Sequence, residues 1–309
     1  MKYVWMQSFK SNNQLKSLLL LIGFPFFLFV IIFLVVVFAG VGDDMTFSQS
    51  WDLAFSSSGE IFLWTCIIVL IWGIISFSFE KEIMFSFAWA KEISRKENPY
   101  VYNIVENLCI SRWLPVPKIG IIDDMDMNAF ATWFNINKSW IVFTKWIVEN
   151  LEKEELEAVA WHELTHLINK DCQLMFIATV FVWVVSLLGE ILIRINYSSK
   201  SNNEKSGSWL FILLGWWFLL LGYLVYPLLN LAISRKREFL ADLGSVELTK
   251  DANAMISALE KISWRATLKK VNKRISMFFI EDPVWEDKSS LFDTHPSISE
   301  RINALKSYS

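Results

Sequence analysis

Residues 158–174 read AVAWHELTHLINKDCQL, and the run MFIATVFVWVVSLLG that follows at 175–189 contains no charged residue. The polar stretch carries His162 and His166 four residues apart, with Glu163 beside the first histidine. The next run is long and apolar enough to belong to a membrane span. A segment with a chemically distinctive pattern therefore leads directly into a candidate transmembrane helix.

The two histidines are predicted to lie on one face of a helix that spans Lys153 to Lys170. Glu154 and Glu155 fall in its first turn, where the helix dipole favours acidic side chains. Side chains four residues apart on a helix are neighbours, so the two imidazoles can bind one zinc ion. The adjacent carboxylate can take a proton from water on that metal, because zinc lowers the pKa of such a water toward about 7.

Two histidines do not complete a catalytic zinc site, which ordinarily has three protein ligands. Asn169 and Cys172 occupy the places where a metzincin has its glycine and third histidine. Downstream, the stretch RKREFLAD at 235–242 puts Glu238 and Asp242 one turn apart on a predicted helix. We expect Glu238 to be the third ligand and Asp242 to accept a hydrogen bond from a ligand imidazole.

Four apolar segments are long enough to cross about 30 Å of hydrocarbon as helices. They run from about 17–39, 61–79, 174–195 and 209–233. The first is too long to be the apolar region of a signal peptide. The composition agrees, because 54% of the residues are hydrophobic and the mean hydropathy is +0.37, against about 45–50% hydrophobic residues in ordinary soluble domains.

The distribution of Lys and Arg predicts the orientation in the membrane, because basic flanking residues stay on the cytoplasmic side. Residues 1–16 contain three lysines, whereas the connection 40–60 contains neither Lys nor Arg, and the cluster RKR follows the last span at 235–237. We therefore expect both termini and the active site to lie in the cytoplasm. The expected parts are an N-terminal hairpin at 1–80, a first protease segment at 81–172, a second hairpin at 173–233 and a second protease segment at 234–309.

The first polar region is predicted to contain a small sheet beside helices. Lys91 to Ile110 is predicted to be a helix, and the β-branched runs Lys118 to Ile122 and Ser139 to Thr144 are predicted strands. The expected fold class is a mainly α membrane protein. It has four transmembrane helices and a cytoplasmic α+β zinc protease domain.

The charge pattern excludes two other classes of function. A net charge of −3 provides no basic excess to hold a nucleic-acid backbone, so no nucleic-acid partner is expected. A transporter is disfavoured because the spans lack paired charges at mid-depth. Glu190, in the third span, has Arg194 four residues later, and we expect the two to pair at the helix surface.

Together these motifs resemble the HtpX-type membrane metallopeptidases, which are related more distantly to the eukaryotic CAAX-processing proteases. The resemblance covers most of the chain and implies a gluzincin core with one Zn²⁺ per chain. It also implies a multi-pass protein of the cell (inner) membrane that acts on misfolded or damaged membrane proteins. The stretches that carry it are NAFA at 128–131, AVAWHELTH at 158–166, REFLAD at 237–242 and THP at 294–296.

The resemblance implies roles for further residues. Asn128 and Ala129 are implied to hold the substrate backbone, with Ser139 to Thr144 as the candidate strand edge. His295 is implied to stabilise the oxyanion or to occupy the open zinc position in a resting state. From the residues alone, a lone histidine before Pro296 is equally well explained as part of a turn.

The predicted function is that of a zinc metalloendopeptidase in which His162, His166 and Glu238 bind the metal and Glu163 is the general base. The predicted partners are polypeptide substrates and the lipid bilayer. Two alternatives stay open: a CAAX-type processing protease, and a zinc-bearing membrane scaffold or sensor that binds clients without cutting them. The sequence does not indicate the oligomeric state.

Overall fold

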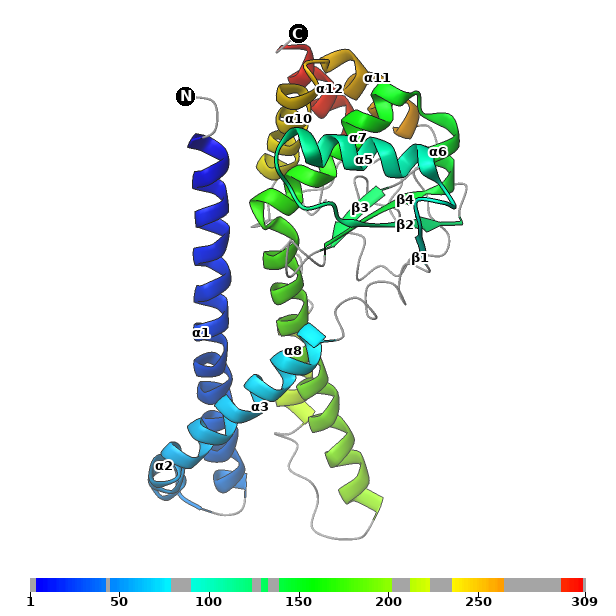
Figure 1. Ribbon diagram of the computed structural model, residues 1–309. Coiled ribbons are helices and arrows are strands. Elements are labelled where there is room, and N and C mark those ends of the chain that lie inside the picture. The colour runs from blue at the N-terminus through cyan, green and yellow to red at the C-terminus, as the bar shows by residue number, and fades with distance from the viewer. Residues whose placement is uncertain are drawn as a thin grey trace. The chain divides into compact units, whose positions relative to one another are not determined.

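The computed structural model describes residues 4–42, 45–78, 90–123, 129–132, 139–201, 212–222, 235–263 and 296–307. The chain divides into two compact units, each assembled from segments far apart in the sequence. The first unit contains residues 1–14, 79–175 and 230–309, and the second contains residues 15–78 and 176–229. Figure 1 shows their helices and strands.

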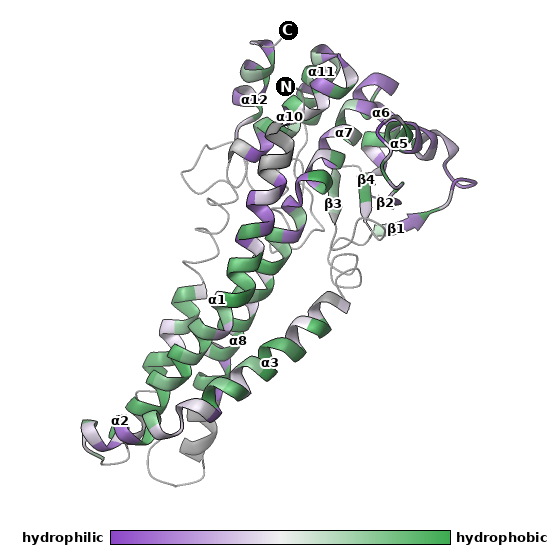
Figure 2. Cartoon of the chain, turned by 60° about the vertical axis from the view of Figure 1, so that its left-hand side comes forward, coloured by the Kyte–Doolittle hydropathy of each residue, from purple (hydrophilic) through white to green (hydrophobic). Residues whose placement is uncertain are grey.

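The second unit consists of long apolar helices. Most of α1 (Val4–Gly42) and α8 (Asp171–Ser201) lies in it, together with α2 (Phe47–Ser56), α3 (Ser58–Ser78) and a short helix, Ile212–Gly222. Within the described residues, three helical stretches are long and apolar enough to cross a membrane: Lys10–Phe38, Ser58–Ser76 and Asp171–Arg194. Figure 2 shows that hydrophobic residues dominate α1, α3 and α8.

Three of the four predicted apolar segments are thus confirmed as long helices. In the fourth, about 209–233, residues 212–222 form an apolar helix and the others lie outside the described residues. The predicted pair is also present, with Arg194 Nη2 at 3.6 Å from Glu190 Oε2 and both side chains exposed.

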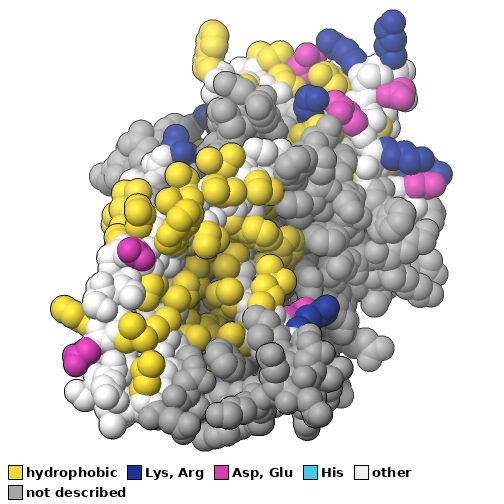
Figure 3. Space-filling view, turned by 90° about the horizontal axis from the view of Figure 1, so that it is seen from below, with side chains coloured by type: hydrophobic (Ala, Val, Ile, Leu, Met, Phe, Trp, Pro, Cys, Tyr) yellow, Lys and Arg dark blue, Asp and Glu magenta, His cyan; other side chains and the backbone are white. Residues whose placement is uncertain are grey.

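Large hydrophobic side chains remain exposed along these helices. Ile22 is 66% exposed and Leu70 is 64% exposed. Such side chains gather on the face seen in Figure 3. An apolar surface of this extent is not stable in water and suits contact with lipid. The unit also has an apolar cluster in its interior, formed by the buried residues Phe24, Leu28, Ile31, Val185 and Phe218.

The first unit contains a four-stranded mixed sheet with the order β1-β2-β4-β3. Its strands are β1 (Ala90–Ile93), β2 (Lys118–Ile122), β3 (Ala129–Thr132) and β4 (Trp140–Thr144). β2 and β4 are parallel, and the two outer pairings are antiparallel. The strands predicted at 118–122 and 139–144 are confirmed.

The helix predicted from Lys91 to Ile110 is wrong over its first part. Lys91 to Ile93 belong to β1, and α5 (Pro99–Ser111) begins only at Pro99. The reason is local, because a proline disfavours the helical conformation of the residue before it but suits the first helical position. Asn98 caps the helix, and its Oδ1 accepts a hydrogen bond from the backbone N–H of Val101 at 3.2 Å.

Helix α7 (Lys153–Asn169) lies at the centre of this unit and confirms the helix predicted there. It packs against the strands β3 and β4 and against the helices α5, α10 (Arg235–Thr249) and α11 (Ala252–Ser263). The short helix α6 (Lys145–Asn150) precedes it in the chain. Helix α12 (Ile298–Lys306) packs on α10 and α11. Almost every residue from Leu156 to Leu167 is buried. The helix ends at Lys170, whose φ of 61° is left-handed, and α8 begins at the next residue.

Helices α7 and α10 approach each other closely. Ser245 Oγ donates a hydrogen bond to the carbonyl of Ala158 at 2.7 Å. A Cβ on Gly244 would lie 2.7 Å from Thr165 Oγ1 and 2.9 Å from its Cγ2. These distances are shorter than van der Waals contact. The absence of a side chain at Gly244 therefore lets the two helices pack at this separation.

Replacing Gly244 by alanine should lower the free energy of unfolding. The helix-propensity gain of up to about 1 kcal/mol is smaller than the cost of overpacking, about 1–3 kcal/mol. The midpoint of thermal unfolding, followed by tryptophan fluorescence in detergent, measures the change. Gly59→Ala is the control, because a Cβ there meets nothing within 4 Å. Adding Thr165→Ala to the Gly244→Ala protein should restore part of the lost stability, because it removes the side chain that the new Cβ would contact. A Gly244→Ala protein as stable as the wild type would contradict the packing argument.

Candidate functional site

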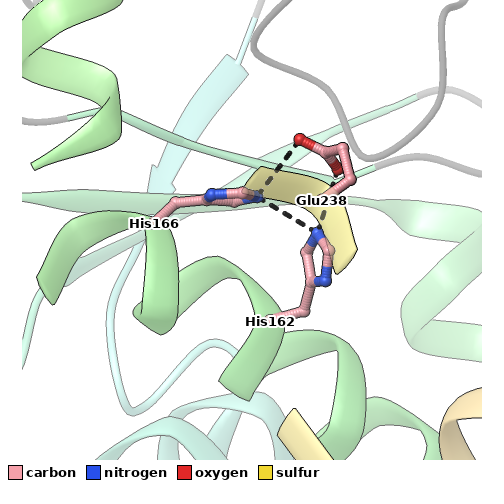
Figure 4. Close-up of side chains that lie close together, drawn as sticks. All are labelled: His162, His166 and Glu238. Atoms are coloured by element: carbon pink, nitrogen blue, oxygen red, sulfur yellow. Dashed lines mark hydrogen bonds and ion pairs between the residues drawn. The ribbon is translucent and has the colours of Figure 1, made fainter. Parts of the chain in front are cut away.

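Three buried side chains from two helices converge in the first unit. His162 and His166 come from α7 and Glu238 from α10, and one possible ligand atom from each lies within 4.8 Å of the others. The Nε2 atoms of the two histidines are 3.1 Å apart. Glu238 Oε2 is 3.5 Å from His162 Nε2, and its Oε1 is 3.7 Å from His166 Nε2. Figure 4 shows the two imidazole nitrogens and the carboxylate directed toward a common point.

The other ring nitrogen of each histidine faces a carboxylate. His162 Nδ1 lies 2.9 Å from Asp242 Oδ1, and His166 Nδ1 lies 2.9 Å from Asp171 Oδ2. A carboxylate accepts hydrogen bonds, so it holds the imidazole proton on Nδ1 and leaves the lone pair on Nε2. Two lone pairs then face each other beside the Glu238 carboxylate. Because buried charge must be compensated, a proton or a metal cation is needed between these groups.

The residues present fit a zinc ion. Two imidazole nitrogens and one carboxylate oxygen form a donor set typical of a catalytic zinc site, which leaves a further position for water or substrate. The carboxylate behind each imidazole is also typical, because it orients the ring and raises its basicity. The fit thus rests on the donor set and on the two Nδ1 contacts together.

Arg301, from α12, holds Asp242 in place. Its Nε donates to Asp242 Oδ2 at 2.8 Å and its Nη2 donates to Oδ1 at 2.6 Å, in the two-pronged geometry that favours Arg over Lys. Burial alone would raise the pKa of Asp242, but the Arg301 guanidinium outweighs it and the pKa is lowered. Asp242 therefore stays anionic and keeps its affinity for the Nδ1 proton of His162.

Sequence reasoning missed Arg301 and Asp171. A signal for Arg301 was present, since Ile298, Ile302 and Leu305 define an apolar helix face on which a charged residue must be paired. Asp171 had no comparable signal. It stands between a polar helix and an apolar one, where an acidic residue is ordinarily solvated.

The pKa values of the site follow from burial and from these carboxylates. With the protein's own groups alone, burial would lower the pKa of His162, but its hydrogen bonds to Asp242 and Glu238 raise it to about 9. Burial lowers the pKa of His166. Burial also raises the pKa of Glu163 to about 7, and in the described part of the chain its two carboxylate oxygens have no hydrogen-bond partner. Glu163 can therefore exchange a proton near neutral pH.

The remaining sequence-predicted residues are placed less completely. Asn128 and His295 lie outside the described residues, whereas Ala129 is buried at the start of β3. Ser139 to Thr144 was expected to be the edge at which substrate adds, and this is wrong. β4 lies in the interior of the sheet order, with β2 on one side and β3 on the other, so both of its edges are already paired.

Comparisons with known proteins identify the family of this chain. The pattern of Peptidase family M48 matches residues 95–309. The "Protease HtpX homolog" of Bacteroides fragilis strain YCH46 is 40% identical over 324 aligned residues, covering 100% of both chains. That of Lactobacillus helveticus strain DPC 4571 is 34% identical, covering 96% of this chain and 97% of its own. That of Dictyoglomus turgidum is 37% identical, covering 78% of this chain and 79% of its own.

Among solved structures, the crystal structure of S. mikatae Ste24p has a similar fold. The TM-score is 0.50 at 19% sequence identity, and the match covers 79% of this chain and 58% of that one. At this identity the likeness concerns the fold alone. The family match and the full-length relatives go further: the chain belongs to peptidase family M48 and, within it, to the HtpX-like membrane metallopeptidases.

Proposed function

We propose that this protein is a zinc-dependent endopeptidase of the cell membrane, in which His162, His166 and Glu238 hold the zinc and Glu163 is the general base. The observation that carries the proposal is the convergence of the two Nε2 atoms and the Glu238 carboxylate in a buried site. Membership in the peptidase family supports hydrolysis of peptide bonds.

The chain's own residues supply the proton transfers. A zinc ion held by His162, His166 and Glu238 would polarise the scissile carbonyl and would make water acidic enough to lose a proton near neutral pH. Glu163 takes the proton of the attacking water and delivers it to the leaving amine nitrogen. Its pKa of about 7 suits both steps, because a group that must accept and then release a proton works best when its pKa is near the working pH.

The substrate is proposed to lie along β3 rather than β4. Among the described strands β3 comes last in the sheet order, and it packs beside α7, which carries the two histidines. Asn128 and Ala129 would contact the substrate backbone there. Main-chain pairing with an extended peptide gives broad specificity. His295 is proposed to stabilise negative charge on the reacting carbonyl.

The biological role is proposed to be quality control of misfolded or damaged membrane proteins. Only Lys170 separates α7 from α8, and α8 includes a candidate span. The two histidines are therefore close in sequence to a candidate membrane segment. The basic residues at 1–16 and 235–237 favour a cytoplasmic site, with both termini on that side of the membrane. Unfolded segments of membrane proteins at that surface are the substrates that this arrangement favours.

Glu163→Gln should abolish cleavage while leaving zinc bound. The variant keeps the size of the side chain but cannot accept the proton, and loss of general-base catalysis costs about 10²–10⁴-fold in rate. Zinc content by metal analysis and cleavage of casein or a membrane-protein substrate are the two measurements, each with and without chelator.

Glu157→Gln is the matched control, because Glu157 is on the same helix, is partly exposed and, in the described part of the chain, forms a surface ion pair with Lys153. If fully zinc-loaded Glu163→Gln cut substrate at the wild-type rate, the assignment of the base would be wrong. A wild-type protein that binds zinc and clients but cuts neither substrate would favour the scaffold alternative.

Arg301→Lys should weaken zinc binding even though the charge is kept. A lysine cannot make both hydrogen bonds to Asp242, so the carboxylate holds His162 less firmly. Residues that orient metal ligands typically contribute about 10–100-fold to metal affinity or activity. Competition with a chromogenic chelator measures the zinc dissociation constant. Arg95→Lys, in an exposed ion pair with Glu106, should leave it unchanged. Equal affinities for Arg301→Lys and the wild type would contradict the role given to Arg301.

The zinc affinity should fall as the pH falls. In the protein alone the pKa of His162 is raised to about 9, so this histidine carries a proton at neutral pH that zinc must displace. Release of one proton per zinc raises the apparent dissociation constant about tenfold for each unit by which the pH is lowered below 9. Titration at several pH values, corrected for protonation of the chelator, tests this slope. An affinity that is constant between about pH 8 and pH 6 would be incompatible with proton displacement.

A further inference from the structure

Helix α1 contributes a buried polar side chain to the first unit. Asn13 is only 7% exposed, although Asn12 and Gln14 beside it are exposed. Asn13 Nδ2 donates to Asp171 Oδ1 at 2.7 Å and to the backbone carbonyl of Asn169 at 3.0 Å. A side-chain amide has two N–H groups on one nitrogen, so both donors are used. These bonds join positions 156 and 158 residues apart in the sequence.

Asp171 divides its two oxygens between two partners. Oδ1 accepts the hydrogen bond of Asn13, and Oδ2 lies 2.9 Å from His166 Nδ1. Arg237 Nε competes for the same Oδ2, at 3.8 Å. A carboxylate held at one oxygen alone can rotate about its side-chain bond, whereas one held at both cannot. The bond from Asn13 therefore keeps Asp171 turned toward His166 rather than toward Arg237.

We propose that Asn13 is a positioning residue of the metal centre, acting through Asp171 on the imidazole of His166. The inference rests on the proposed function, in which His166 binds zinc through Nε2. The imidazole must present that nitrogen at a fixed angle, and its hydrogen bond at Nδ1 sets the angle. The ligand set on α7 and α10 is thus supported from the N-terminal helix, which continues into the candidate span Lys10–Phe38.

A purely structural role for Asn13 makes a different prediction. The bond to the Asn169 carbonyl satisfies an acceptor at the C-terminal end of α7, where helices leave carbonyls unpaired. If Asn13 served only this purpose, its loss would lower the stability of the fold. It would have no specific effect on zinc affinity, and its effect would not depend on Asp171.

The test compares zinc affinity and kinetics in the full-length protein purified in detergent. The variants are Asn13→Ala, Asn13→Leu, Asp171→Ala and the double variant Asn13→Ala/Asp171→Ala. Leucine has the branched shape of asparagine, is larger and has no donor, so it removes the hydrogen bonds without opening a cavity. Asn12→Ala is the matched control, because Asn12 is the exposed neighbour on the same helix. Zinc dissociation constants come from chelator competition, and the visible spectrum of the cobalt-substituted protein reports the geometry of the ligands.

Loss of Asn13 should weaken zinc binding about 3- to 10-fold. This is less than the roughly 10- to 100-fold expected for loss of Asp171, because Asp171 contacts the ligand His166 directly and Asn13 acts only through Asp171. The kcat should fall with KM unchanged, the cobalt spectrum should shift, and Asn12→Ala should match the wild type. In the Asp171→Ala background, removing Asn13 should cause no further loss, because its path to His166 is already gone. Asp171→Leu, which offers no acceptor to Asn13 or His166, replaces Asp171→Ala where the latter does not fold.

Two results would overturn the inference: wild-type zinc affinity and cobalt spectrum in both Asn13 variants, or losses that multiply in the double variant. Failure of the proposed function would look different. The wild-type protein itself would then bind no zinc or cut no substrate, and both ideas would fall together. A wild type that binds zinc and cuts, beside Asn13 variants that do the same, would reject only the role of Asn13.

Discussion

Two imidazole nitrogens lie 3.1 Å apart in the interior of the first unit, with a carboxylate beside them. This arrangement is unfavourable unless a cation or a proton lies between the groups, and the surrounding structure is organised to maintain it. Each ring is held from behind by an acidic side chain, and the acid behind His162 is itself held by Arg301. The stability of the fold and the chemistry of the site are thus coupled through one cluster of charges.

The helices are arranged to bring these charges together. α7 supplies two of the three proposed metal ligands, because His162 and His166 are four residues apart and so lie one helical turn apart. The left-handed Lys170 ends this helix, and the next residue, Asp171, contacts His166. α10 supplies Glu238 and Asp242, also one turn apart, and the missing side chain at Gly244 lets it approach α7. The regular spacing of two helices therefore accounts for most of the inner geometry.

The features that depend on spacing along one element were the predictable ones. The helix at 153–170, the strands at 118–122 and 139–144 and three of the four apolar segments follow from local periodicity and composition, and the structure agrees with them. The order of the strands is a tertiary property, which is why β4 was mistaken for an edge. Asn13, Asp171 and Arg301 were missed for the same reason, since each acquires its meaning only from a partner distant in the chain or from a neighbouring helix.

The order of these residues along the chain has a consequence for biosynthesis. Asn13 is made first, then the pair on α7, then Glu238 and Asp242, and Arg301 last. The ribosome must therefore translate as far as Arg301 before all of these groups can meet. A nascent chain still under synthesis, or one cut short before α12, lacks the guanidinium that holds Asp242 against His162. Because the site depends on a residue that is translated after all its other members, the site stays incomplete while the earlier segments are emerging from the ribosome.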